Sequence, residues 1–585
     1  MRDLSHILGT LVYPAKFKGD FFKRKNHTLA VVLIVAIALL LFYSFYGSWI
    51  WLAYDVGREI LVPAKLAQGD MLYRDIIYWY GPVSAYINSI FIRLFGLKVD
   101  VLNYVGLLLT LLSALSIYLL VYKLVDYFWA IYAGILFVAH SLIAPVGFSY
   151  VMPYSYAVSY GSSFLLIGVL ALYFFTQKSR IPYLFIGLIS ISLSFASKLE
   201  FIPVVITVII AYSLFLFLNN NHYSPKTYLL VFFLPLILGL SIWLLPLTAI
   251  DFDTFLGNIL HQEMLAHHFK EGFIVRILRT YSPTVIFEGL QGLVIFSLLT
   301  IIFYLSTYLK IYTKNYTFLL FIFLLLYISL LLNISYNIDY IFLRIYPFVN
   351  ILYILILLFE YLQNKHLSTF TLFKGTLTLI ALSLYTRQGS VYGLWQPLSF
   401  ITLFFFLEKV KSYLLVYLGN RQKKRLNSAI ILTLAVMILI GVIRIPYHIN
   451  QGAQTTSIQG SGGTIRVAKK RAKPIENAVN FIELLDSNNI SFGPEAGWLS
   501  VLTGKIDPIR ATQWWFYVED EIISDLKKEN IEYLVFYYDK TDTFFEYKPK
   551  MKEIEQFVIN HYTLDQRYRD GVTIDIYKRK TDITF

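Results

Sequence analysis

Long apolar segments, separated by short polar and basic breaks, follow one another from residue 29 to residue 444. Each is close to the ~20 residues that a helix needs to cross the hydrocarbon core of a bilayer. No small-residue cleavage pattern follows the first segment, so we expect it to remain as a helix. We predict about thirteen membrane-spanning helices, at residues 29–46, 101–122, 129–144, 158–175, 181–197, 201–218, 228–250, 284–308, 316–333, 345–362, 368–386, 390–407 and 427–444.

The pattern changes after residue 445, where shorter apolar runs alternate with charged positions. Residues 451–463, rich in Gln, Gly, Ser and Thr, are expected to form a flexible linker before a basic patch at 466–473. Beyond it we predict helices at 475–485, 519–529 and 550–560, and strands at 490–492, 533–537, 562–568 and 572–577. The chain then divides into a short segment 1–27, a membrane domain 28–445 and an α/β domain 446–585.

Composition supports this division, since 57% of the residues are hydrophobic and only 15% are charged. Charged residues make up about a quarter of an ordinary soluble chain. The predicted fold class is a polytopic α-helical membrane protein with a C-terminal extracytoplasmic α/β domain. The chain has no cysteine, which excludes disulfides, thiolate metal ligands and thiol nucleophiles.

The net charge of +13 comes from Lys and Arg in short runs between the apolar segments. Such runs are typical of membrane orientation signals, so we expect membrane lipids and no nucleic acid as partners. The basic segment 1–27 is predicted to be cytoplasmic. Treating residues 82–95 as an interfacial helix places the later basic loops on the same side, and an odd number of spans places the C-terminal domain outside. We predict a multi-pass protein of the plasma or inner membrane.

The large first outer loop, residues 51–100, contains the densest charge in an apolar setting. Hydrophobic sequence cannot hold such charges without water or partners, so a functional site is the first hypothesis. The charged residues are Asp55, Arg58, Glu59, Lys65, Asp70, Arg74 and Asp75.

The order of features in residues 54–96 is specific. Asp55 is followed by a helical run, and then come Gln68-Gly69-Asp70, Leu72-Tyr73, Tyr80-Gly81-Pro82 and Arg93-Leu94-Phe95-Gly96. This order resembles the first outer loop of the GT-C superfamily of membrane glycosyltransferases, which includes protein O-mannosyltransferases and aminoarabinose transferases. Many relatives have Lys-Pro-Pro where this chain has Tyr80-Gly81-Pro82, so another cation must replace that lysine.

The resemblance implies transfer of a sugar from a polyprenyl-monophosphate carrier to a glycan, lipid or protein acceptor at the outer face. It assigns the catalytic base to Asp55, and a single displacement would invert the anomeric centre. Asp55 could instead cap a helix. Asp75 is the competing base, and the two acids could also divide the work or hold a divalent metal ion, which is the only cofactor considered. Glu59 could tune Asp55, or pair with Arg58 or Lys65.

Cations must neutralise the departing lipid phosphate. Lys198 lies in the turn Ser197-Lys198-Leu199-Glu200 between two apolar segments, where an internal pair with Glu200 or a snorkelling lysine is the alternative. The predicted substrate-binding residues are Arg58, Glu59, Arg74, Tyr80, Lys198, Glu200 and Arg344. We expect Asp55 to open into an outward cavity with Arg58, Arg74, Lys198 and Arg344.

Two further features are less specific. The densest histidine group is His261, His267 and His268 with Glu263, for which an interfacial loop helix is favoured over a metal site.

A second motif is Gly493-Pro494-Glu495 with Leu502-Thr503-Gly504, which resembles a strand-to-helix turn in the outer domains of related transferases. Structural support is favoured over acceptor binding for this turn.

Two alternatives to an enzyme remain. A polysaccharide polymerase or lipid-linked sugar flippase can also have about a dozen spans, but a flippase should carry charges deep in several helices, whereas most charges here are at helix ends. A membrane scaffold without activity predicts that Asp55→Asn is harmless.

Overall fold

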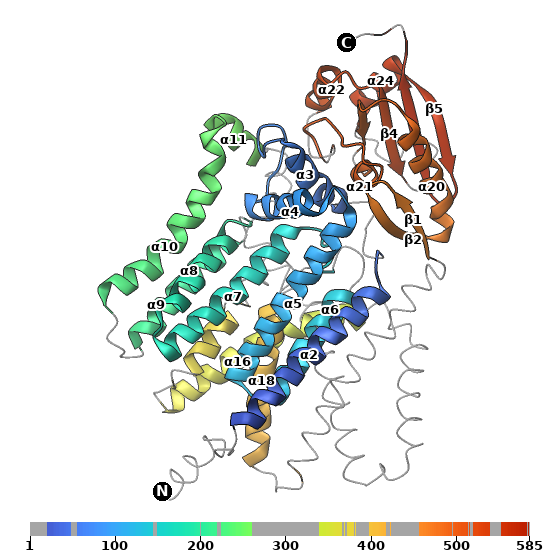
Figure 1. The fold of residues 1–585 in the computed structure, drawn as a ribbon. Helices are drawn as coiled ribbons and strands as arrows, with labels where there is room; N and C mark the ends of the chain where they lie inside the picture. Colours follow the sequence, from blue (N-terminus) through green and yellow to red (C-terminus); the bar gives the residue numbers. More distant parts are fainter. Residues whose placement is uncertain are drawn as a thin grey trace, which may run out of the picture.

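The computed structural model describes residues 20–47, 55–143, 149–198, 201–218, 224–259, 338–364, 368, 371–379, 381, 397–416, 422, 455–493, 495–512, 514, 519–538, 551–581 and 583. Two bodies make up this part of the chain: a bundle of long apolar helices and, at one end of it, a C-terminal domain built on a sheet (Figure 1).

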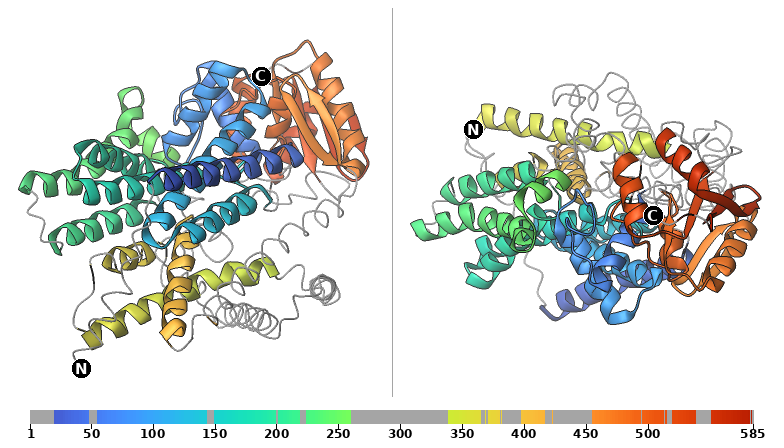
Figure 2. Two further views of the ribbon diagram at one scale, coloured as in Figure 1. Left: turned by 60° about the horizontal axis from the view of Figure 1, so that its bottom comes forward. Right: turned by 90° about the horizontal axis from the view of Figure 1, so that it is seen from above.

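The long helices of the bundle pack side by side (Figures 1 and 2). They are α2 (Asp20–Ser44), α5 (Val99–Leu124), α6 (Tyr127–Ile143), α7 (Tyr156–Lys178), α8 (Ile181–Phe195), α9 (Phe201–Leu218), α10 (Pro225–Leu244), α16 (Ile338–Asn364) and α18 (Pro397–Val416). Within the described residues, four helices are long and apolar enough to cross a membrane: His27–Ser44, Val99–Leu124, Tyr156–Lys178 and Lys226–Thr248.

The first seven predicted spans all coincide with helices. The predicted spans 284–308, 316–333 and 427–444 lie outside the described residues, so the total of thirteen stays a prediction. The described helices fit a polytopic helical membrane protein, because α2 and α5 expose large apolar side chains, such as Leu40 (67% exposed) and Tyr104 (47%), that suit contact with lipid.

Two shorter helices come from the first outer loop, α3 (Val56–Gln68) and α4 (Pro82–Phe95). Both lie between α10 with the short α11 (Phe252–Ile259) and the C-terminal domain (Figures 1 and 2). Every residue of α3 from Val56 to Leu66 is buried, in spite of three charged side chains. α4 exposes Leu94 and Phe95 at its end, as the predicted interfacial helix requires.

The C-terminal domain is α/β, as predicted. Its four-stranded sheet has the order β3-β4-β6-β5, with β3 and β4 parallel and the other pairs antiparallel. The strands are β3 (Ile490–Phe492), β4 (Tyr533–Tyr538), β5 (Tyr562–Arg569) and β6 (Thr573–Arg579). The helices are α20 (Lys469–Leu484), α21 (Gly497–Leu502), α22 (Glu519–Lys528) and α24 (Lys552–His561).

The prediction of a flexible linker at 451–463 is wrong for its described part. The chain forms an antiparallel hairpin of β1 (Thr455–Gly460) and β2 (Gly463–Ala468). Ile458, Ile465 and Val467 are buried, and this alternation was hidden in the sequence by the surrounding Gln, Ser and Gly. The hairpin is also bound to the bundle, because the Val99 N–H donates to the Gly462 carbonyl at 2.8 Å. The C-terminal domain is therefore docked on the helices.

Candidate functional site

Asp55 stands immediately before α3. Asp55 is the N-cap residue of the helix, but its backbone is already helical (φ −53°, ψ −25°) and its side chain makes no capping hydrogen bond. The carboxylate is 32% exposed and accepts a hydrogen bond from Arg58 Nη1 at 3.1 Å. The partly exposed Asp55 carboxylate thus lies at the edge of a buried cluster and is bound by the cation of that cluster.

The Arg58 guanidinium is the centre of this cluster, with a side chain that is 1% exposed. Besides Asp55 it binds Glu59 Oε1, at 3.0 Å from Nε and 2.9 Å from Nη2, and it donates to the Tyr154 carbonyl at 3.1 Å. Burial alone would lower the Arg58 pKa. Tyr80, Asp55 and Glu59 outweigh that effect and raise the pKa well above its ordinary value, so Arg58 is charged.

Glu59 pairs with Arg58 and not with Lys65, which decides between two of the predicted partners. Its second oxygen accepts the Tyr156 backbone N–H at 2.7 Å, which links α3 to the start of α7. Burial raises the Glu59 pKa, while Arg58 and the Tyr156 N–H act in the opposite direction. These contacts make Glu59 the residue that orients the Arg58 side chain.

Tyr80 brings a second cation to the cluster. The Arg58 guanidinium lies 4.6 Å from the centre of the Tyr80 ring, and the Lys198 ammonium lies 4.7 Å from the same centre and 5.5 Å from that of Tyr154. Lys198 is 7% exposed. An aromatic face attracts cations, so one ring holds both. Lys198, which follows α8, therefore lies beside the Tyr80-Gly81-Pro82 segment, and its role as the cation that replaces the Lys-Pro-Pro lysine stays a prediction.

The close approach of the two loops depends on Gly81. Its N–H donates to the Ser197 carbonyl at 3.0 Å. A Cβ atom built on Gly81 would lie 2.0 Å from the Ala196 carbonyl oxygen, a distance that no side chain tolerates. The Tyr80-Gly81-Pro82 sequence thus permits a contact that the Lys-Pro-Pro of relatives could not make in the same way.

Arg74 and Asp75 form a separate ion pair at 2.7 Å, with side chains 51% and 35% exposed. Asp75 also accepts the Met71 N–H at 2.9 Å, and its pKa is lowered by the hydrogen bond from Arg74. These contacts close the loop between α3 and α4. They give Asp75 a structural role in this loop.

The remaining predicted residues are only partly visible. Glu200 and the histidine group at 261–268 lie outside the described residues. Arg344 belongs to the backbone of α16, but its side chain is outside the described part of the chain. The structure therefore brings together Asp55, Arg58, Glu59, Tyr80 and Lys198, and a role for Arg344 or Glu200 stays a prediction.

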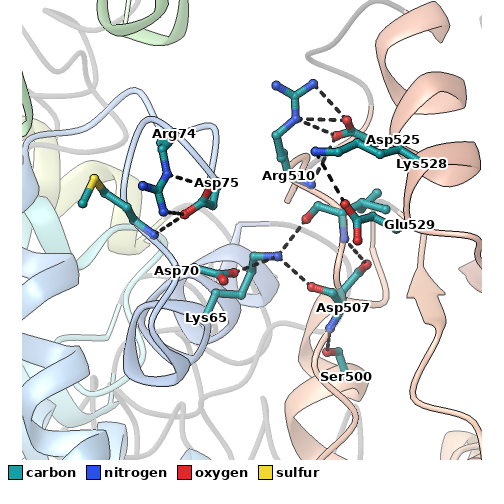
Figure 3. A network of polar contacts seen from close by, with 12 residues as sticks. Lys65, Asp70, Arg74, Asp75, Ser500, Asp507, Arg510, Asp525, Lys528 and Glu529 are labelled. Carbon is teal, nitrogen blue, oxygen red and sulfur yellow. Dashed lines mark hydrogen bonds and ion pairs between the residues drawn. The ribbon is translucent and has the colours of Figure 1, made fainter. Parts of the chain in front are cut away.

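The other end of α3 carries a network that sequence reasoning did not find (Figure 3). The buried Lys65 ammonium donates to the carbonyls of Asp507 (2.8 Å) and Ile509 (2.9 Å) and pairs with Asp70 at 3.3 Å. Gly69, with φ +113°, ends α3 and turns the chain so that Asp70 reaches Lys65. Lys65 and Asp507 are 442 residues apart, so no local pattern could reveal the contact.

Asp507 is itself buried and tied into the C-terminal domain. Its carboxylate accepts the Phe492 N–H at 2.8 Å and the Ile509 N–H at 3.2 Å. Burial raises the pKa of Asp507 to about 7, although Lys65 and these N–H groups act in the opposite direction. This loop fixes the C-terminal domain to α3.

The strand-to-helix turn after β3 makes a second contact with α3. A Cβ atom on Gly57 would lie 3.3 Å from the Trp498 nitrogen and 3.5 Å from the Gly497 Cα, so α21 packs directly on the first turn of α3. This contact is two residues from Asp55. It explains the turn as structural support, and acceptor binding there stays a prediction.

The bundle of long apolar helices with an α/β domain docked at one end defines the class, a polytopic helical membrane protein. No protein-family model and no curated protein matches the sequence. Solved structures match it in fold. ArnT from Cupriavidus metallidurans bound to undecaprenyl phosphate has 10% identity and a TM-score of 0.54, over 95% of this chain and 99% of that chain.

A second matching structure is the Archaeoglobus fulgidus oligosaccharyltransferase tethered to an acceptor peptide containing the NVT sequon. It has 14% identity and a TM-score of 0.51, over 97% of this chain and 76% of that chain. Both are GT-C glycosyltransferases, so the resemblance predicted from residues 54–96 is confirmed at the level of the fold.

A divalent metal finds no suitable ligand set in what the structure describes. These residues contain no group of three or more His, Asp or Glu side chains that could hold one. Asp55 and Asp75, the two acids predicted to share a metal ion, are each paired with a different arginine, Asp55 with Arg58 and Asp75 with Arg74.

Proposed function

We propose that the protein is a membrane glycosyltransferase that moves a sugar from a polyprenyl-monophosphate donor to an acceptor at the outer face of the membrane. The observation that carries the proposal is the partly exposed Asp55 carboxylate beside two buried cations, Arg58 and Lys198, that share the Tyr80 ring. This is the arrangement that transfer from a phosphate leaving group needs: a base at the surface and fixed positive charge next to it.

In the proposed step, Asp55 accepts the proton of an acceptor hydroxyl or amine. The freed lone pair attacks the anomeric carbon from the face opposite the phosphate, and the bond between that carbon and the phosphate oxygen breaks. The bonding electrons go to the lipid phosphate, whose added negative charge is stabilised by Arg58 and Lys198. One displacement of this kind inverts the anomeric centre.

The neighbouring residues prepare these groups. Glu59 binds Arg58 through Nε and Nη2 while Asp55 binds Nη1, and the Tyr80 ring lies against both Arg58 and Lys198. Arg74, Glu200 and Arg344 are proposed as further substrate contacts.

Two neighbours support the substrate classes. ArnT is described with bound undecaprenyl phosphate, which matches a polyprenyl-phosphate donor, and the oligosaccharyltransferase is described with an acceptor peptide. For this chain the acceptor class stays open between glycan, lipid and protein. An outer-facing site with a cytoplasmic N-terminus, in the plasma or inner membrane, is part of the proposal.

The test is to incubate the purified full chain with a panel of polyprenyl-phosphate sugars and candidate acceptors, and to measure release of polyprenyl phosphate. Release with at least one donor is expected. If no donor is consumed while proteoliposomes of the same preparation move a lipid-linked sugar between leaflets, the flippase alternative is correct and the proposal fails.

A further inference from the structure

A basic cluster at the junction of β2 and α20 has no part in the proposed reaction. Residues 466–473 contain five basic residues and no acidic one. Four of the side chains are exposed, and Arg471 is half-buried. The exposed ones are Arg466, Lys469, Lys470 and Lys473. So much charge of one sign on a short segment needs a partner of opposite charge or water around it.

The hairpin fixes this cluster to the ends of two membrane helices. The Arg466 N–H donates to the Gly47 carbonyl at 2.9 Å, three residues beyond the end of α2. At the start of α5, Asp100 accepts the Thr464 N–H at 3.3 Å and the Tyr46 hydroxyl at 2.6 Å. These contacts determine how far the cluster stands from the membrane.

The hairpin contacts lie close to exposed apolar residues of α2 and α5. On α2 the nearest strongly exposed apolar residue is Tyr43 (61% exposed), and on α5 it is Tyr104 (47%). With a rise of about 1.5 Å per residue, each lies within about 8 Å of the hairpin contacts along its helix. Tyrosines at such positions are typical of the membrane interface, so the basic cluster lies at headgroup level.

Acids also stand near the cluster. Asp100 is engaged by Tyr46 and Thr464, and the nearest acid along α20 is Glu476, three residues after Lys473. On the neighbouring sheet, Asp570 precedes Gly571, which packs against Lys470, so the five basic residues outnumber these acids. At physiological salt, charges interact over about 8 Å, so the cluster attracts headgroups only where it stands close to the membrane surface.

We propose that the basic cluster binds the headgroups of anionic phospholipids in the leaflet next to the C-terminal domain. Several lysines and arginines beside a membrane span attract an anionic lipid surface in this way. Binding would hold the C-terminal domain, and with it α21 and α3, at a constant height above the membrane. The proposal does not require the chain to be a glycosyltransferase.

The test uses the purified full chain in detergent, titrated with phosphatidylglycerol or phosphatidylcholine and analysed by native mass spectrometry. Wild type is expected to retain phosphatidylglycerol in preference to phosphatidylcholine, and Lys469→Gln/Lys470→Gln/Lys473→Gln to lose on the order of tenfold or more of that preference. The matched control is Lys527→Gln/Lys528→Gln/Lys552→Gln, which removes the same charge from α22 and α24 at the far end of the domain (Figure 1).

The control triple variant is expected to keep the preference, and both triple variants to keep the wild-type unfolding temperature because the six side chains are exposed. A basic-cluster variant that keeps the preference, or a control that loses as much of it, would overturn the proposal. Lipid retention is measured without turnover, so its result is independent of the test for glycosyl transfer.

Discussion

Each end of α3 buries a cation, Arg58 near the start and Lys65 near the end, and the partners of these two cations differ. Lys65 has three acceptors for its three ammonium protons, two of them backbone carbonyls of the C-terminal domain. Arg58, seven residues earlier, shares its charge with Asp55, whose carboxylate reaches solvent, and lies against the Tyr80 ring with Lys198 on the same ring. The Lys65 end of α3 is closed and holds the two domains together. The Arg58 end is open to solvent on one side, at Asp55.

This difference shows that burial of charge does not by itself indicate a reactive site. Both side chains are 1% exposed, and both stand in the same charged loop. The partners distinguish them: fixed carbonyls complete the coordination of Lys65, while Arg58 is bound by two acids and an aromatic face, and one of those acids, Asp55, is partly exposed. The following predictions separate the two ends.

The largest effect is expected from Asp55→Asn. Loss of the base should lower the rate of sugar transfer by about 10²- to 10⁴-fold with little change in donor affinity. The measurement is release of polyprenyl phosphate under saturating donor. Asp70→Asn, which removes an acid from the closed end, is the control and should stay close to wild type. Loss of activity in Asp75→Asn but not in Asp55→Asn would move the base to the competing residue.

Lys198→Met should lower turnover on the order of 100-fold, because one preorganised positive charge near the leaving phosphate is lost. Methionine keeps the length and apolar character of the side chain, so the fold should persist. The same assay with Lys98→Met, an exposed lysine near the start of α5, gives the background. Equal rates for the two variants would remove Lys198 from the site.

Lys65→Met should act on stability and not on chemistry. It leaves the buried carbonyls of Asp507 and Ile509 without their donor, at a cost of about 2–4 kcal/mol in the free energy of unfolding. Denaturant unfolding of the full chain measures this, and Lys528→Met, whose side chain is 72% exposed, should change it by less than about 0.5 kcal/mol. A stable Lys65→Met protein would show that the closed end does not hold the domain.

Asp507 should make the docking pH-dependent. Its folded pKa of about 7 lies above the ordinary value near ~3.9, so the folded protein binds more protons between these values. Stability from this group is therefore full below about pH 4 and is lost as the pH rises through 7, by up to about 4 kcal/mol. Thermal unfolding at pH 5 and pH 8.5 measures the slope, which Asp507→Asn should flatten. An unchanged slope in that variant would exclude Asp507 as its source.

The smallest effect is expected from the Tyr80 hydroxyl. Its distance to Arg58 Nη2 is 3.4 Å, a weak hydrogen bond, whereas the ring face contacts both cations. Tyr80→Phe should keep turnover within about threefold of wild type, and Tyr80→Leu should lose about tenfold because the ring is gone. If phenylalanine is as damaging as leucine, the hydroxyl and not the ring is the functional part.

Much of the fold followed from the sequence, because apolar length and alternation are local properties. Seven successive helices of the bundle and all four strands of the C-terminal sheet coincide with predicted segments. The hairpin at 455–468 was missed because its inward-facing Ile458, Ile465 and Val467 are sparse among polar residues. Periodicity is weak evidence where only a few positions of a strand pair face inward.

The site was predictable only in part. Asp55, Arg58 and Glu59 lie within one helical turn, so their proximity follows from spacing. Lys198 comes close to them because its ammonium group lies against the Tyr80 ring and because Gly81 packs on the Ala196 carbonyl. Both contacts are set by tertiary packing. The pairing of Lys65 with a carbonyl 442 residues away could not be derived from neighbouring residues.

The most direct test of the central claim is an experimental structure of the full chain with bound polyprenyl phosphate. The account predicts phosphate oxygens within hydrogen-bonding distance of the Arg58 guanidinium or the Lys198 ammonium, with the Asp55 carboxylate open toward the side from which an acceptor would arrive. Phosphate bound elsewhere, with Arg58 and Lys198 still enclosed by protein, would contradict it.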